Sequence, residues 1–543
     1  MLTLASLLLV QQSSLSNYWH KLTDRTFSGV YHANAFDMAM MIPYFLVLFV
    51  LAAYGMHRYK LLYDYYSYRK NVPATPPPVE HWPKVTIQLP IFNERYVIER
   101  LVDAVSQFDY PRELLDIQVL DDSTDETRDV ARACVDRHAA QGLPIVYIHR
   151  TNREGYKAGA LENGLRTAHG EFVAIFDADF LPPPDFLRRT IPHFLAPGND
   201  NIGMVQTRWT YLNGDYSLLT RVETILLDGH FVVEHGGRSR RGSFFNFNGT
   251  AGVWRRAAID SAGGWEHDTL TEDTDLSYRA QLRGWKFIYH MDIECPSELP
   301  VEMNSFKSQQ ARWAKGLTQV ARKSLPSILR APIPLHIKAE AFFHLTANIS
   351  YPLMMLLSTL LLPAMIVRFY QGWLQVLAID LPLFLASTCS ISSFYLMSQR
   401  QLYPKTWARS ILYMPFVMAL GIGIGVRNSV AVIEALLGIQ SEFVRTPKYR
   451  IEGHLRENWI AKAYKKRSGW MPWLEVALGL YFALAVAYSL QNENYATVPF
   501  LLLFVGGYAY TGVMSLGQGY FERLRFGIAS GETRPAATGA PSF

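Results

Sequence analysis

Uninterrupted apolar runs, each long enough to cross a lipid bilayer, constrain the fold of this chain more than any other feature. Residues 37–56 form one such run with almost no charge, and the hydrocarbon core of a bilayer requires about 20 such residues. Four similar runs lie in the C-terminal half, at 342–367, 373–397, 472–490 and 497–518. We therefore expect a multi-pass membrane protein with about five spans and a large water-facing insert.

Two further apolar segments fit this pattern less well. The stretch 407–440 contains Arg427 and Glu434 and is rich in glycine. For this stretch we expect an interfacial or re-entrant element, with two short spans as the alternative. The first ten residues form a short apolar run without a basic start. They are expected to be an interfacial or partly inserted segment, with a cleaved signal peptide as the alternative.

Basic residues indicate on which side of the membrane each connecting segment lies. They gather at 57–60, 69–70, 448–467 and 523–525. Cytoplasmic segments carry this excess of lysine and arginine. The insert, the loop at 441–470 and the tail at 521–543 are therefore expected in the cytoplasm, and the segment 1–35 on the other side. A bacterial inner or plasma membrane is the expected location.

Composition and short motifs exclude several classes of protein. The net charge of +5 is modest and reflects the basic segments beside the membrane, so no nucleic-acid partner is expected. Cys134, Cys295 and Cys389 are scattered singly, which indicates neither a disulfide framework nor a zinc site. The chain has no GxGxxG or GxxxxGK[ST] motif, which argues against a standard dinucleotide fold and a P-loop.

The water-facing insert shows alternating strand and helix patterns behind a linker at 57–83, whose second half is rich in proline. Strands are predicted at 84–90, 116–120, 144–150, 171–177 and 202–209. Helices are predicted between them at 96–108, 125–139, 155–168 and 184–195. This order predicts an α/β domain with a parallel, doubly wound sheet and helices on both faces.

Polar residues follow three of these strands, at the sheet edge where such folds bind ligands. They are Asn93 and Glu94, Asp121 and Asp122, and Asp177 and Asp179. Two carboxylates at a strand end suit a divalent cation such as Mg²⁺ or Mn²⁺, which takes its other ligands from water and phosphate. The alternatives are that the pair 177 and 179 opens a turn, and that the pair 121 and 122 caps the helix at 125–139.

The stretch TEDTD at 271–275 puts three carboxylates into the first turn of a predicted amphipathic helix. Acids at a helix start usually cap it and interact with its dipole. A carboxylate held rigidly there can also accept a proton from a bound hydroxyl. We expect Asp273 to be the proton acceptor, Glu272 the cap and Asp275 a surface acid.

Cationic and aromatic residues could complete a site for a phosphorylated ligand. Lys157 starts a predicted helix at the same sheet edge, although a solvated lysine is the alternative. Arg312 and Trp313 lie on an amphipathic helix whose basic side also carries Lys307 and Lys315. A position at the membrane surface explains that helix, but it leaves the Arg-Trp pair unexplained. A guanidinium suits a diphosphate, and an indole suits stacking on a sugar ring.

In chain order, DDS (121–123), DAD (177–179), TED (271–273) and QQARW (309–313), followed by spans, resemble the D, DxD, TED and QxxRW signature of membrane-integrated family 2 glycosyltransferases. Cellulose and hyaluronan synthases belong to that group. The stretch from FFNFNGTAGVW to QQARW most resembles cellulose-synthase-like mannan and glucomannan synthases of the A and C types. FVRTPK (443–448) is similar to the gating loop FxVTxK, with Arg445 in place of valine. The resemblance covers about residues 84–450.

The resemblance implies a Rossmann-like α/β catalytic domain of the GT-A type, inserted in a multi-span helical membrane domain. The implied segments are an extracytoplasmic or interfacial start at 1–35, a membrane helix at 36–56, a linker at 57–83, the catalytic domain at 84–300, amphipathic interfacial helices at 301–335, membrane and interfacial helices at 340–440, a gating and cytosolic loop at 441–470, membrane helices at 471–520 and a cytosolic tail at 521–543.

The resemblance also implies residue roles. Asp273 would be the general base, and Asp179, with Asp177, would hold Mg²⁺ or Mn²⁺. The residues that would bind the nucleotide sugar are Pro90, Asn93, Glu94, Asp121, Asp122, Lys157, Asp177, Arg312, Phe443, Thr446 and Lys448. The residues that would bind the acceptor are Trp313, Asn248, Gly249 and Glu272.

The implied reaction is inverting transfer of a hexose from UDP-glucose or GDP-mannose to the non-reducing end of a growing β-glycan (a glucan, mannan or glucomannan), which then crosses the bilayer through a tunnel. Polar side chains in the spans could line such a tunnel, although helix packing also explains them. The alternatives are a transferase that adds one sugar to a lipid, as ceramide glucosyltransferases do, and a non-catalytic scaffold or transporter. The expected partners are the donor, a saccharide acceptor, the bilayer and a possible second copy of the chain.

Overall fold

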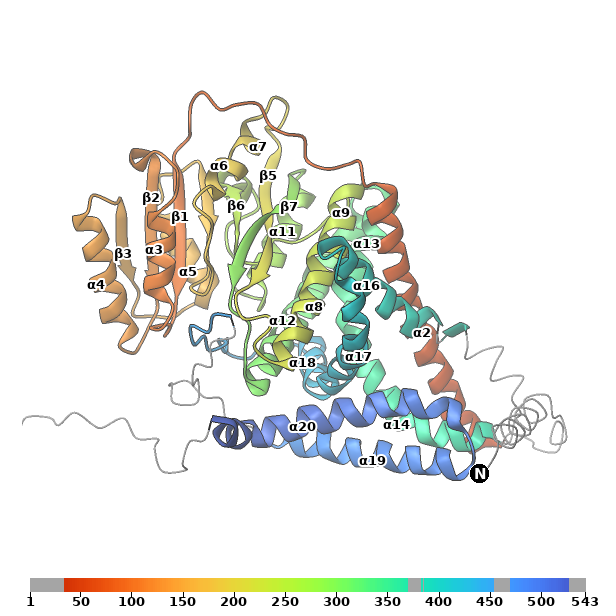
Figure 1. Ribbon diagram of the computed structural model, residues 1–543. Helices are drawn as coiled ribbons and strands as arrows, with labels where there is room; N and C mark the ends of the chain where they lie inside the picture. Colours follow the sequence, from red (N-terminus) through yellow and green to blue (C-terminus); the bar gives the residue numbers. More distant parts are fainter. Residues whose placement is uncertain (1–33, 370–381, 384, 454–468, 527–543) are drawn as a thin grey trace, which may run out of the picture.

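The computed structural model describes residues 34–369, 382–383, 385–453 and 469–526. An α/β domain lies at one end of the molecule, and long apolar helices lie at the other (Figure 1). Helices α8 (Leu218–Gly229), α12 (Met303–Arg330) and α18 (Gly425–Leu437) lie between these two parts. The expectations for residues 1–33, 454–468 and 527–543 fall outside the described residues.

Seven strands form one mixed sheet with the order β3-β2-β1-β4-β6-β5-β7. The strands are β1 Val85–Ile91, β2 Leu115–Asp121, β3 Ile145–His149, β4 Phe172–Ile175, β5 Ile202–Tyr211, β6 Gly252–Arg255 and β7 Lys286–Ser297. Strand β6 pairs antiparallel with both β4 and β5, and every other pairing is parallel. The predicted α/β domain of the GT-A type is confirmed, but the prediction of an all-parallel sheet was wrong.

The sequence pattern did not reveal β6 and β7 as strands. Strand β6 has four residues, and so short a run has too few alternating positions to indicate a strand or its direction. Every residue of the central strand β1 is buried, as expected for a strand covered on both faces of the sheet. The sheet core therefore holds the strand ends, and with them the polar residues that follow, in fixed positions.

The helices that follow the first strands begin and end close to the predicted positions. They are α3 Ile98–Ser106, α4 Thr127–Ala140 and α5 Tyr156–Leu165. The helix predicted at 184–195 consists of two short pieces, α6 Phe186–Thr190 and α7 Pro192–Leu195. Proline at 192 explains the break, because proline has no N–H to donate to a helical hydrogen bond, although Ile191 before it keeps helical backbone angles.

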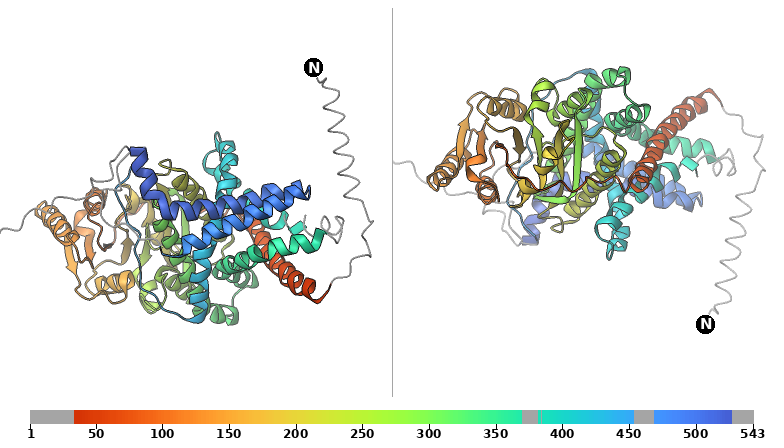
Figure 2. Two further views of the ribbon diagram at one scale, coloured as in Figure 1. Left: turned by 90° about the horizontal axis from the view of Figure 1, so that it is seen from below. Right: turned by 90° about the horizontal axis from the view of Figure 1, so that it is seen from above.

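Four helices are long and apolar enough to cross a membrane, within the part of the chain that is described. They lie at Ala35–Ser67, Leu335–Val367, Met471–Gln491 and Val498–Gln518. The last two belong to α19 and α20, which run side by side (Figure 2). The prediction of a multi-pass membrane protein is confirmed. The span predicted at 373–397 falls partly on residues outside the described ranges.

The glycine-rich stretch forms two helices, Trp407–Gly423 and Gly425–Leu437, which are bent by 44° at the break between them. Together they pass the same test of length and apolarity and would make a fifth candidate. This geometry fits either one broken span or a re-entrant element. It does not fit two separate spans.

Helix α12 connects the membrane helices to the α/β domain through ion pairs. Lys307 Nζ lies 2.5 Å from Glu475 of α19, and Lys315 Nζ lies 2.7 Å from Glu434 of α18. Both lysines are buried, so the basic side of this helix does not face headgroups, as a helix at the membrane surface would require. These pairs fix α12 against the membrane helices, and Lys323 of the same helix pairs with Glu266, Asp268 and Asp275 of the α/β domain.

Candidate active site

A cleft at the carboxyl ends of the central strands brings together residues from eight separate parts of the chain. Of the predicted site residues, those that line it are Pro90, Glu94, Asp122, Lys157, Asp177, Asp179, Asn248, Gly249, Glu272, Asp273, Arg312, Trp313, Phe443, Thr446 and Lys448. They come from the ends of β1, β2 and β4, the start of α5, the loop before β6, the start of α11 (Glu272–Leu282), the middle of α12 and the segment 443–448. The cleft lies at the sheet edge that the α/β pattern predicts for ligands.

Two predicted residues do not line the cleft. Asp121 is fully buried, and its carboxylate accepts hydrogen bonds from the backbone N–H of Ser123 and the hydroxyl of Tyr147. Asn93 bridges the loops after β1 and β2, because its Oδ1 accepts from the backbone N–H of Thr124 at 2.9 Å. In this structure both side chains support the loops behind the cleft, and their contact with a donor stays a prediction.

The pair at 121 and 122 does not cap the following helix, which was the alternative interpretation. The N-cap of α4 is Glu126, and Asp125 accepts from the N–H of Thr127 at its start. Asp122 instead pairs with Arg150, whose Nε and Nη2 lie 2.8 and 2.5 Å from its two oxygens. This bidentate pair fixes the Asp122 carboxylate at the cleft wall.

Each carboxylate of the DAD motif lies against a lysine. Lys157 Nζ is 2.5 Å from Asp177 Oδ1, and Lys448 Nζ is 2.7 Å from Asp179 Oδ2. Burial lowers the pKa of Lys157, but the neighbouring acids Asp177, Glu272 and Asp273 together outweigh this effect, and the net pKa lies above the ordinary value. The ammonium therefore stays charged and is available to an anionic ligand.

The two DAD carboxylates also fit a divalent cation. Mg²⁺ and Mn²⁺ prefer oxygen ligands and are commonly held by one or two carboxylates together with phosphate oxygens and water. An ion at Asp179 would share the carboxylate with Lys448 or displace it. A tighter acidic group, Glu266, Asp268 and Asp275, is already paired with Lys323 at distances from 2.5 to 3.0 Å.

Two of the three carboxylates of the TEDTD stretch, Glu272 and Asp273, line the cleft, and Asp275 does not. Asp275 is fully buried and pairs with Arg279 at 2.8 Å and Lys323 at 3.0 Å, so the expectation of a surface acid was wrong. Asp273 faces the cleft, where its Oδ1 accepts from the N–H of Thr274 at 2.7 Å. Burial, followed by the neighbouring Glu272, raises the pKa of Asp273 to about 7. A carboxylate with that pKa is a competent proton acceptor near neutral pH.

Gly249 allows the loop before β6 to pass between Asp273 and Lys157. Its φ of +82° is unfavourable for other residues. A Cβ at this position would also lie 3.1 Å from Asp273 Oδ2 and 3.4 Å from Lys157 Nζ. The Gly249 carbonyl accepts from Lys157 Nζ at 2.9 Å. The glycine thus sets the spacing between the carboxylate and the ammonium.

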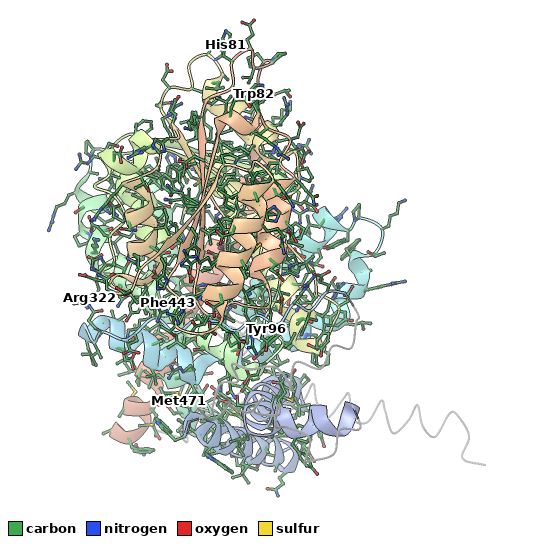
Figure 3. All side chains as sticks on the ribbon, turned by 90° about the vertical axis from the view of Figure 1, so that its left-hand side faces the viewer. His81, Trp82, Tyr96, Arg322, Phe443 and Met471 are labelled. Carbon is green, nitrogen blue, oxygen red and sulfur yellow. The ribbon has the colours of Figure 1, made fainter. Side chains whose placement is uncertain are left out.

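The segment 443–448 closes one side of the cleft. The Arg312 guanidinium lies 4.5 Å from the centre of the Phe443 ring and donates to the Val444 carbonyl at 2.9 Å. Arg445 Nη1 lies 3.7 Å from Glu94, whose pKa burial raises to about 7 against the opposing effect of Arg445. Figure 3 shows Phe443 at the end of the α/β domain nearest the membrane helices, with Met471 of α19 below it.

Sequence reasoning missed two groups in the cleft. The first is a cationic and aromatic stack, in which the Arg153 guanidinium lies 3.4 Å from the Phe92 ring centre and 4.9 Å from that of Tyr156. A planar base could stack on such a group. The second is Trp209, Tyr211 and Glu223 on β5 and α8. No local pattern distinguishes these residues from ordinary core and surface positions.

Part of this chain is similar to known glycosyltransferases. Residues 83–316 match the family described as glycosyltransferase like family 2. The chain is 48% identical over 254 residues to glucomannan 4-beta-mannosyltransferase 2 of Arabidopsis thaliana, covering 46% of this chain and 47% of that one. It is also 48% identical over 255 residues to glucomannan 4-beta-mannosyltransferase 1 of Oryza sativa subsp. japonica, covering 46% of this chain and 48% of the relative. The chain thus spans about half the length of these relatives.

Among solved structures, a mannosyltransferase of Pyrobaculum calidifontis in complex with GDP-mannose and Mn²⁺ is similar, with 22% identity and a TM-score of 0.48. The similarity covers 67% of this chain and 99% of that one.

Proposed function

We propose that the chain is an inverting mannosyltransferase of the family described as glycosyltransferase like family 2, which residues 83–316 match. It transfers mannose from a nucleotide sugar to the non-reducing end of a β-1,4-linked mannan or glucomannan. One observation carries this proposal: a carboxylate at Asp273, an acidic pair at Asp177 and Asp179, and the guanidinium of Arg312 all line one cleft. Those groups are what glycosyl transfer from a diphosphate donor needs.

The donor and the linkage are inferred from the relatives. Both curated relatives are named glucomannan 4-beta-mannosyltransferases, and each is 48% identical to this chain over the part they share. These names favour GDP-mannose over UDP-glucose as the donor and a β-1,4 linkage in the product.

The residues of the chain supply the chemistry as follows. The Asp273 carboxylate removes the proton from the acceptor hydroxyl, which then attacks the anomeric carbon of the donor. The diphosphate leaves from the opposite face of the sugar, so an α-linked donor gives a β-glycoside. Arg312 and Lys157 place positive charge near the leaving group, in a cleft where such preorganised charges are effective. Trp313, which lines the same cleft, stacks on the terminal sugar of the acceptor.

A divalent cation, when bound, supplies further neutralisation of the diphosphate. Asp179 with Asp177 would hold it, and their oxygen ligands suit both Mg²⁺ and Mn²⁺. Segment 443–448, which carries Phe443, Thr446 and Lys448 at the cleft, covers the nucleotide.

The membrane helices give the enzyme a route for its product. The cleft lies beside α12, which packs on α18 and α20, so a polymer extended at the cleft enters the bilayer without leaving the protein. The catalytic domain faces the cytoplasm, where nucleotide sugars are made. Both curated relatives are plant proteins, which favours a non-bacterial membrane over the bacterial one expected from the sequence.

The test is incubation of purified full-length protein with radiolabelled GDP-mannose or UDP-glucose and Mg²⁺ or Mn²⁺. We expect a ladder or an insoluble polymer from GDP-mannose that an endo-β-1,4-mannanase degrades. A single lipid-soluble product would instead support the one-step glycolipid transferase. A folded protein that neither binds nor turns over any nucleotide sugar would support the scaffold or transporter.

A further inference from the structure

The cleft wall formed by β5 and α8 carries buried polar atoms that have no hydrogen-bond partner in the described part of the chain. They are both carboxylate oxygens of Glu223, the hydroxyl of Tyr211 and the indole Nε1 of Trp209. All three side chains line the same cleft as Asp179 and Asp273. Buried polar groups in folded proteins are nearly always paired, so three unpaired groups on one wall indicate a ligand with matching hydrogen-bonding groups.

Glu223 is the most unusual of the three. Its exposed fraction is 1%, and no lysine, arginine or histidine among the described residues lies within ion-pair distance of it. The cation that influences it most is Lys448, which already contacts Asp179 at 2.7 Å and donates to the Glu298 carbonyl. Burial raises the pKa of Glu223 well above its ordinary value.

Another buried acid of α8, Asp228, has a hydrogen-bond partner, so an unpaired acid is not a general property of this helix. Asp228 is also buried, with an exposed fraction of 2%, but its carboxylate accepts from Gln399 Nε2 at 2.7 Å. Asp228 does not line the cleft. The acid that faces the cleft is the one that lacks a partner.

The chemistry of this wall fits a sugar ring better than a phosphate. An acid with no cation beside it offers nothing that attracts an anion, whereas its oxygens can bind hydroxyl groups, as can a phenol and an indole N–H. Apolar surface accompanies them, since Leu227 and Phe180 line the same wall and the Phe180 and Trp209 ring centres are 5.1 Å apart. Aromatic surface with a few polar groups is typical of a site that orients a small ligand.

We propose that Glu223, Tyr211 and Trp209 form a hexose-binding subsite of this cleft. The sugar hydroxyls that they bind belong either to the hexosyl unit of the donor or to a terminal unit of the acceptor. This inference rests on the proposed function and adds to it the residues that select the sugar.

The experiment uses full-length protein in nanodiscs and compares wild type with Glu223→Leu. Binding of GDP-mannose and of GDP is measured by calorimetry, and the KM for β-1,4-linked mannohexaose is measured at saturating donor. Loss of a hydrogen-bonded acid should weaken one sugar ligand by about 10- to 100-fold and leave the affinity for GDP unchanged. Weaker GDP-mannose binding assigns the subsite to the donor, and a higher KM for mannohexaose assigns it to the acceptor.

Two controls separate this effect from a folding defect. Asp228→Asn, a buried acid on the same helix outside the cleft, should change neither sugar affinity nor GDP affinity. The melting temperature of Glu223→Leu should not fall, because an unpaired buried acid is replaced by an apolar side chain. If Glu223→Leu fails to fold, Glu223→Gln, which keeps the shape of the side chain, is measured in its place.

The inference is overturned if folded variants at 223 bind both sugar ligands as wild type does, or if they lose GDP and GDP-mannose affinity equally. The proposed function fails separately, if wild-type protein binds neither GDP-mannose nor UDP-glucose.

Discussion

The two walls of the cleft differ in how their polar groups are paired. On the wall formed by the ends of β1, β2 and β4, every acid has a cationic partner: Glu94 with Arg445, Asp122 with Arg150, Asp177 with Lys157 and Asp179 with Lys448. On the wall formed by β5 and α8, the polar side-chain atoms of Trp209, Tyr211 and Glu223 have no hydrogen-bond partner among the described residues.

This difference indicates what each wall receives. Paired charges are stable without a ligand, and an arriving diphosphate or cation can exchange partners with them. Unpaired groups are costly without a ligand and gain most from one that brings hydroxyls. Asp273 lines the same cleft and has no ion pair with any described residue, so its carboxylate is available to the reacting hydroxyl.

The largest effect is expected from Asp273→Asn, which tests whether Asp273, an acid without an ion pair, accepts the proton of the acceptor hydroxyl. Removing a general base lowers turnover by about 10²- to 10⁴-fold, while donor binding stays near that of wild type. Single-turnover transfer from GDP-mannose, with donor affinity measured in parallel, checks this. Substantial remaining turnover would show that Asp273 has no role in proton transfer and is only an acid at the start of a helix.

Asp179→Asn tests the paired wall and should produce the next largest effect. Loss of charge stabilisation at a leaving group lowers turnover by about 10²-fold or more, and chelation of divalent ions by EDTA should inactivate wild type. Titration of Mn²⁺ against transfer rate checks both outcomes. Wild-type metal dependence in the variant would show that the ion binds elsewhere in the chain.

The pH dependence of kcat/KM should reveal the raised pKa of Asp273. The pKa of Asp273 is raised from 3.8 to about 7, so kcat/KM should rise with pH as the carboxylate loses its proton near pH 7. Its stability effect has the opposite sign. The folded protein holds this proton more tightly than the unfolded chain, so stability falls as pH rises from 3.8 to about 7. Asp273→Asn should remove the dependence of kcat/KM and reduce that of stability, to which Glu94, whose pKa is also raised to about 7, contributes as well.

Arg312→Lys tests whether the cleft needs a planar cation and should have a smaller effect. Lysine keeps the charge but cannot reproduce the guanidinium's hydrogen-bonding geometry or its stacking on Phe443. We expect a fall in kcat/KM of about tenfold, because one charged hydrogen bond contributes about 1.5 kcal/mol. The measurements are kcat/KM and the affinity for GDP. Equal GDP affinity in the two proteins would exclude a contact with the diphosphate.

The smallest effect on activity is expected from Asp275→Asn, in the same helical turn as Asp273 but outside the cleft. Its partners Arg279 and Lys323 would lose a buried acid, which costs about 3 kcal/mol of stability. The melting temperature should fall while kcat per folded molecule stays constant. A large fall in kcat would mean that the paired acids outside the cleft also position the reaction.

Much of this protein could be predicted from local sequence patterns. Apolar runs indicate spans because a bilayer has a fixed thickness. The first five strands and the helices after the first three of them follow from hydrophobic periodicity, and the strand-end acids follow from their order. The antiparallel strand β6 was missed, because four residues carry too little periodicity to indicate a direction.

The sequence by itself determined the membrane class, the α/β domain and the acids that face one sheet edge, because each depends on neighbours along the chain. Only the tertiary structure decided which acids are paired. Asp179 meets Lys448 and Lys307 meets Glu475 across more than 150 residues, and Glu223 meets no cation in the described structure. Pairing of charges depends on which distant segments pack together, and local residue patterns do not specify that packing.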